Sequence, residues 1–128
     1  MVNYIKILSI CFFCFSCVNK DKCNNTVSFI GSYKNIYDKE AKNILIINAN
    51  GTFEQIFTKD NIEKKYRGTY KYFKDDCTVI FEKLKILHSL PKRLQEHHME
   101  EYPATFRNNN IVFGGESDDD INYYRIEE

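Results

Sequence analysis

The stretch KNILIINANGTFEQIFT, residues 42–58, decides the fold class. Its first part, 42–49, contains the run Ile44-Leu45-Ile46-Ile47, and a continuous apolar run of this kind predicts a strand buried on both faces. Asn50-Gly51 follows and is the strongest hairpin signal in the chain, because a type I′ turn needs positive φ at both central positions. Residues 52–58 then return as the partner strand. We therefore expect an antiparallel β-hairpin here.

The same pattern of β-branched and aromatic runs between turn signals continues on both sides of this hairpin. It is clearest where Tyr66, Gly68, Tyr70 and Tyr72 alternate with polar residues, which is the period of a half-buried strand. Together these signals predict an all-β antiparallel meander of about seven or eight strands. The further expected strands span residues 29–37, 63–73, 77–86, 111–113 and 121–126.

One segment, residues 89–102, favours a short helix. Ser89 is suited to an N-cap, Pro91 is tolerated in a first turn, and Leu94 and Tyr102 fall near one face. The apolar pattern is sparse, so an irregular segment that covers one end of a barrel explains the same residues equally well.

Four short motifs carry a family resemblance: Gly31-Ser32-Tyr33, Asn50-Gly51-Thr52-Phe53, Gly68-Thr69-Tyr70 and Tyr123-Tyr124-Arg125-Ile126. With them, residues 29–126 resemble the small lipocalin-like lipoproteins of bacterial envelopes. The resemblance implies a lipocalin-like β domain over 29–128 that closes into a small barrel or half-barrel. It implies nothing about a ligand, since one fold hosts many functions.

The N-terminus has the organisation of a signal peptide. A single cation, Lys6, precedes an apolar stretch over residues 7–15, and polar residues begin directly after Val18. A membrane-spanning helix needs about 20 apolar residues, so this run is too short to remain as one. We expect residues 1–16 to be a cleaved lipoprotein signal peptide. The alternative is a buried apolar element at the start of a cytosolic protein.

Cys14-Phe15-Ser16-Cys17 resembles the lipobox of bacterial lipoproteins. The resemblance implies that Cys17 is lipidated and becomes the first residue of the mature chain. Cys14 stands where leucine is usual, which leaves ordinary cleavage after Ser16 as an alternative. Several acyl chains hold a protein at a membrane almost permanently, so residues 17–28 would form a lipidated tether. The expected location is the cell envelope, on the outer membrane, although the sequence leaves the inner membrane open.

Charge and cysteine content limit the partners and the compartment. Lysine and arginine balance aspartate and glutamate at a net charge of +0, which argues against a nucleic-acid partner, because such a partner requires a basic face. Outside the N-terminal segment the cysteines are Cys23 and Cys77. In an oxidising compartment these two can form a disulfide, and two unpaired thiols are the alternative.

A barrel of about eight strands either fills with side chains or holds one small ligand. A packed aromatic core is therefore the first expectation, and a pocket for a small apolar ligand is the second. The candidate pocket residues are Phe53, Phe57, Tyr66, Tyr70, Tyr72 and Phe81.

Catalytic and metal-binding signals are weak. His97, His98 and Glu101 could offer two metal ligands on one helix face, but a site needs further ligands and a solvated polar face explains these residues better. A charged hairpin tip likewise explains Asp118-Asp119-Asp120 better than calcium does. No nucleophile motif occurs, so we expect neither enzymatic activity nor a cofactor. We expect a lipid-anchored binding or structural module. The alternatives are a carrier of a small apolar ligand and an envelope-side inhibitor or immunity protein.

Overall fold

A computed structural model describes residues 22–85, 100–114 and 121–127 of the chain. This part is all-β, as the hydrophobic pattern predicts, and it contains no α-helix. The strands are β1 (Gly31–Asn35), β2 (Lys42–Ile47), β3 (Thr52–Lys59), β4 (Ile62–Phe73), β5 (Thr78–Glu82), β6 (Glu101–Arg107), β7 (Asn110–Val112) and β8 (Tyr124–Arg125).

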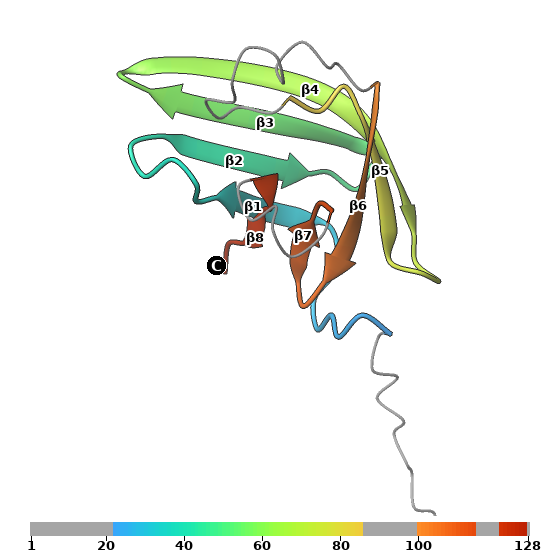
Figure 1. Cartoon of the computed structure of the whole chain (residues 1–128). Helices are drawn as coiled ribbons and strands as arrows, with labels where there is room; N and C mark the ends of the chain where they lie inside the picture. Colours follow the sequence, from blue (N-terminus) through green and yellow to red (C-terminus); the bar gives the residue numbers. More distant parts are fainter. Residues whose placement is uncertain (1–21, 86–99, 115–120, 128) are drawn as a thin grey trace, which may run out of the picture.

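The eight strands form one antiparallel sheet in the order β7-β6-β5-β4-β3-β2-β1-β8. From β1 to β7 each strand pairs with the next one along the chain, which is the predicted meander, and β8 returns to pair with β1. Ile111 in β7 and Tyr123, next to β8, exchange two backbone hydrogen bonds of 2.8 and 2.9 Å. This contact brings the two ends of the sheet together, and the result is a nearly closed barrel (Figure 1).

The turn between β2 and β3 differs from the expected type. Gly51 has a φ of 83°, but Asn50 does not have a positive φ. The prediction of a type I′ turn at Asn50-Gly51 is therefore wrong. Instead the backbone N–H of Asn48 donates to the backbone carbonyl of Thr52 at 2.9 Å. A loop of three residues that ends in a left-handed glycine fits this geometry.

Type I′ geometry occurs instead at two asparagine-containing pairs. Asp60 and Asn61 between β3 and β4 have φ values of 52° and 62°, and Asn108 and Asn109 between β6 and β7 have φ values of 50° and 64°. Asparagine and aspartate tolerate the left-handed region because their short polar side chains can bond locally.

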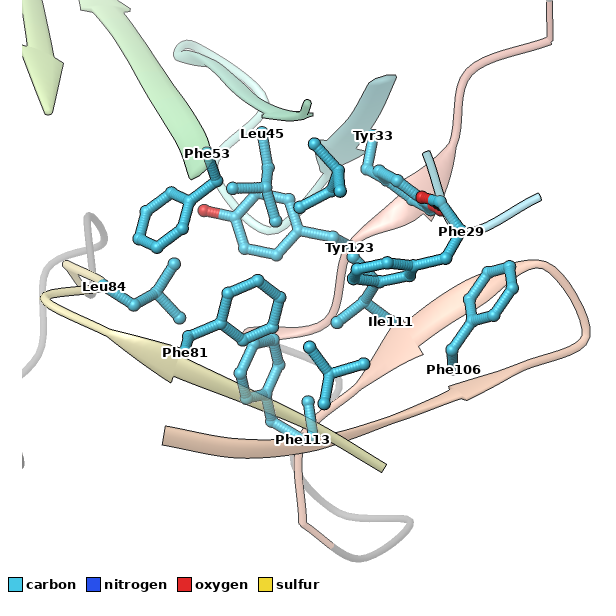
Figure 2. Close-up of a cluster of buried hydrophobic side chains, with 13 residues drawn as sticks. Phe29, Tyr33, Leu45, Phe53, Phe81, Leu84, Phe106, Ile111, Phe113 and Tyr123 are labelled. Atoms are coloured by element: carbon cyan, nitrogen blue, oxygen red, sulfur yellow. Dashed lines mark hydrogen bonds between the residues drawn. The ribbon is translucent and has the colours of Figure 1, made fainter. Parts of the chain in front are cut away.

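The core lies inside the barrel and is mostly aromatic (Figure 2). In β2 only alternate side chains enter it: Leu45 and Ile47 are buried, whereas Ile44 and Ile46 are only half-buried. The expectation that both faces of β2 are buried is therefore wrong. The buried cluster consists of Phe29, Tyr33, Leu45, Ile47, Phe53, Val79, Phe81, Leu84, Ala104, Phe106, Ile111, Phe113 and Tyr123.

The expected helix over 89–102 is wrong at its C-terminal end, because Glu101 and Tyr102 belong to β6. Residues 86–99 lie outside the described part of the chain. Proline is disfavoured inside a sheet, yet Pro103 stands in β6 opposite Ile80 of β5. Strand β7 pairs with β6 only from Thr105 onward. At Pro103, β6 therefore has a strand neighbour on one side only within the described residues, and the missing N–H is tolerated.

Candidate functional site

A disulfide joins the N-terminal segment to the barrel. Cys23 and Cys77 are bonded, with their Cα atoms 6.5 Å apart, and both residues are buried. Cys77 ends the turn between β4 and β5 with a φ of 60°. The bond therefore holds the segment beside that turn. We call this region of the barrel, marked by Cys23, Val27, Phe73 and Cys77, the disulfide end.

Asparagine side chains extend this attachment. Asn25 Nδ2 donates to the Phe106 carbonyl at 2.8 Å, and Asn25 Oδ1 accepts from the backbone N–H of Asn109 at 2.8 Å. In return, Asn109 Oδ1 accepts from the backbone amides of Thr26 and Val27 at 2.7 and 3.2 Å. The described part of the expected tether, residues 22–28, is thus docked on the barrel from Cys23 onward (Figure 1).

An open hollow of about 830 Å³ lies beside this docked segment. Its floor is aromatic, with Phe29 stacked on Tyr72 at a centroid distance of 4.7 Å and in edge contact with Tyr70 and Phe106. Lys22, Lys74 and Asp75 also line it. The hollow therefore combines apolar ring surface with charged groups.

Two motifs of the family resemblance meet at Arg125. Its guanidinium lies over the Tyr33 ring, and Nη1 donates to the Tyr33 hydroxyl at 3.0 Å and to the Ser28 carbonyl at 2.7 Å. Gly31 leaves room for this guanidinium, because a Cβ at position 31 would overlap it. Burial raises the pKa of Tyr33 to about 12 even though Arg125 acts in the opposite direction. The arrangement joins the first and last strands.

A polar cluster lies inside the barrel around Gln55, which is fully buried. Gln55 Nε2 donates to the Lys85 carbonyl at 2.9 Å and to the Tyr123 hydroxyl at 3.2 Å, and Gln55 Oε1 accepts from the Lys85 amide at 2.9 Å. The Tyr123 hydroxyl in turn donates to Asn43 Oδ1 at 2.9 Å. Burial raises the pKa of Tyr123 to about 12. Gln55 thus binds the backbone of Lys85 as a neighbouring strand would.

The predicted pocket residues do not surround one common space. Phe53 and Phe81 are fully buried and pack edge to face at 5.4 Å in the core. Tyr70 and Tyr72 pack against that core and line the hollow at the disulfide end. Tyr66 lines a different hollow together with Leu84 and Tyr102.

The last pocket candidate, Phe57, lies opposite Lys64 and is half-buried outside the buried cluster. The six predicted pocket residues therefore fall into two groups: two lie in the packed core, and four lie at separate positions outside it.

The remaining site candidates are largely outside the described residues: Cys17, His97, His98 and Asp118–Asp120 all lie there. Glu101 begins β6. Within residues 22–85, 100–114 and 121–127, no group of three or more His, Cys, Asp or Glu residues could hold a metal ion. In the same residues no helix is long and apolar enough to cross a membrane.

Sequence reasoning missed Asn25, Asn109 and Gln55. The paired asparagines at 24–25 and 108–109 were a usable signal, because asparagine side chains often bond to backbone groups in turns. Gln55 lies two positions after the buried Phe53, on the same face of β3, but it was missed because glutamine is mostly exposed in proteins. No protein-family model, curated protein or solved structure matches this chain significantly.

Proposed function

We propose that the protein is a lipocalin-like lipoprotein of the bacterial envelope, anchored through a lipid on Cys17, that acts as a non-enzymatic binding module. The observation that carries the proposal is the buried Cys23–Cys77 disulfide. Disulfides persist in exported proteins and are rare in the cytosol. The sequence provides independent support for export, in the signal-peptide pattern of residues 1–16 and the lipobox-like Cys14–Cys17.

Metabolic labelling with a palmitate analogue tests the anchor. Cys17→Ala should abolish the label, because Cys17 is the proposed acceptor. Cys11→Ala is the matched control, since it removes another cysteine of the same apolar segment, and it should keep both the label and the membrane location. Equal labelling of Cys17→Ala and the unaltered chain would contradict the proposal. Separation of the two envelope membranes then tests the outer-membrane location.

A second candidate, a carrier of a small apolar ligand, is favoured by the hollow at the disulfide end. The half-buried Tyr70 and Tyr72, which pack against the core residues Phe29 and Phe106, offer apolar surface in this hollow, and ligand sites are commonly concave and aromatic-lined. Native mass spectrometry of the full-length protein from the envelope should then show a bound small molecule that denaturation releases. Ligand-free protein would speak against the carrier function while leaving the anchor unaffected.

A further inference from the structure

The disulfide end has little freedom to move away from an anchor at Cys17. Cys23 follows Cys17 by six positions, and an extended chain spans at most about 3.6 Å per residue, or about 20 Å in total. The sequence alone suggested a tether up to residue 28, which would reach about twice as far. The disulfide and the Asn25–Asn109 hydrogen bonds shorten it, because they fix residues 23–27 on the barrel.

Two exposed apolar side chains lie at this same end. Phe73, the last residue of β4, is 49% exposed, and Val27 in the docked segment is 42% exposed. Strand alternation directs Phe73 outward, because its neighbour Tyr72 packs inward against Phe29. Phenylalanine is among the apolar side chains with which interfacial segments insert at the boundary between headgroups and acyl chains.

We propose that the disulfide end of the barrel rests on the bilayer surface, with Phe73 and Val27 inserted at the lipid boundary. The proposal rests on the anchor at Cys17 and adds an orientation to it. The molecule then stands with the turn between β4 and β5 against the membrane.

The charges at this end are of both signs, and Arg107 also lies here, because its neighbours Phe106 and Asn108 bond to the backbone of Cys77 and Cys23. Lys22 and Lys74 lie near Asp75 and Asp76 around the turn and the hollow. The hydrogen bond from the Thr78 amide lowers the pKa of Asp76, so its carboxylate stays charged. Attraction to anionic lipid requires a basic cluster, so contact with the bilayer depends on the anchor and the apolar residues and not on headgroup charge.

The opposite end of β4 provides a matched control. Ile62 begins the same strand and is 61% exposed. A strand rises about 3.3 Å per residue, so the length along β4 from Ile62 to Phe73 is about 35 Å. Figure 1 shows that the β3–β4 tip and the β4–β5 turn lie at different extremities of the barrel. Exposure is therefore similar at the two positions, whereas proximity to the anchor differs.

The experiment uses single tryptophans, because the chain contains none. Phe73→Trp, Val27→Trp and Ile62→Trp are made in the full-length lipidated protein and reconstituted into phosphatidylcholine vesicles. Phosphatidylcholine brominated high on its acyl chains should quench the fluorescence of Trp at 73 and 27 several-fold more than that at 62. The emission at 73 should also shift to the blue on reconstitution. Replacing part of the lipid by phosphatidylglycerol should change neither result.

Vesicle flotation distinguishes a failure of the proposed orientation from a failure of the lipid anchor. If the protein floats with the vesicles but quenching at 73 and 27 equals that at 62, the orientation is overturned and the anchor stands. If the protein does not float, the anchor fails and the orientation falls with it. Stronger quenching at 62 than at 73 would reverse the proposed orientation and overturn it as well.

Discussion

The guanidinium carbon of Arg125 lies 5.1 Å from the centre of the Tyr33 ring, although 92 positions separate the two residues in the chain. The Tyr33 hydroxyl, which accepts from Arg125, itself donates to the Phe29 carbonyl at 2.6 Å. The interaction therefore links β8, β1 and the segment that precedes β1. It reinforces a pairing of β1 with β8 that covers only two residue pairs.

Removing Arg125 should weaken this closure. Arg125→Ala should lower the free energy of unfolding by about 2 kcal/mol, because it removes a cation–π contact and two charged hydrogen bonds. Arg125→Lys should restore only part of the loss, since lysine lacks the planar fork. Arg107→Ala, at an exposed position, is the control for the charge change and should have little effect. Urea unfolding measures all three, and equal effects of the changes at 125 and 107 would refute the structural role of Arg125.

The Cys23–Cys77 disulfide should contribute strongly to stability. It encloses a sequence separation of 54 residues, and a loop of that size stabilises by about 4 kcal/mol in the chain-entropy model. Dithiothreitol should therefore lower the urea midpoint of the unaltered protein to that of the Cys23→Ser/Cys77→Ser double variant. The double variant should not respond to dithiothreitol. An unchanged midpoint of the unaltered protein after verified reduction would contradict this prediction.

Gly68 should tolerate no side chain. A Cβ at this position would overlap the Glu82 carbonyl and the Phe53 ring, and overpacking of this kind costs about 1–3 kcal/mol. Gly68→Ala should therefore lower the thermal midpoint markedly. Gly51→Asn is the comparison. Gly51 has a positive φ, which asparagine adopts readily, and a Cβ there would make only an ordinary contact with the Tyr70 carbonyl at 4.0 Å. Similar midpoints for the two variants would argue against close packing at Gly68.

Alkaline pH should destabilise the protein through Tyr123. Burial raises the pKa of Tyr123 to about 12 from 10.0, so below pH 10 both folded and unfolded chains keep the proton and the full stability is present. As the pH rises from 10 towards 12, the unfolded chain releases the proton while the folded chain retains it. The free energy of unfolding should therefore fall across this range, by about 3 kcal/mol for a shift of two pKa units.

Tyr123→Phe isolates this contribution. The variant should lose about 1–2 kcal/mol at neutral pH, because Asn43 loses a buried hydrogen-bond donor. Its stability should also decline less steeply than that of the unaltered protein above pH 10, because the contribution of Tyr123 is gone. Some decline should persist, since burial also raises the pKa values of Tyr33 and Tyr70. Urea unfolding over a pH series measures both effects. Parallel pH profiles would show that Tyr123 does not titrate as its burial requires.

The elements that the sequence predicted well have a local cause. In β4 the tyrosines at 66, 70 and 72 are half-buried and alternate with exposed residues, as the period of two requires. The hairpin at 42–58 is also confirmed, because Ile47 pairs with Phe53 and Lys42 with Thr58. The turn type within it was wrong, because an Asn-Gly pair fits two loop lengths and the pairing register selects one.

Strand β6 was missed for a different reason. The sequence pattern favoured a short helix or an irregular cover over residues 89–102 and predicted no strand over residues 101–107, where Pro103 disfavours a central strand. The short β7 leaves one side of β6 without a strand partner at Pro103 within the described residues. The length of β7 decides whether Pro103 has a strand neighbour on that side, and residues 89–107 themselves contain no signal for it.

The sequence by itself determined an all-β antiparallel meander, because alternation and turn chemistry act between residues a few positions apart. Tertiary structure alone decided that Gln55 is a buried partner of Lys85, that Arg125 lies over Tyr33, and that the segment after Cys23 is docked on the barrel. These contacts join residues 30 to 92 positions apart. Whether such polar groups are buried depends on which strand lies opposite them, and this is decided only when the sheet curves into the nearly closed barrel.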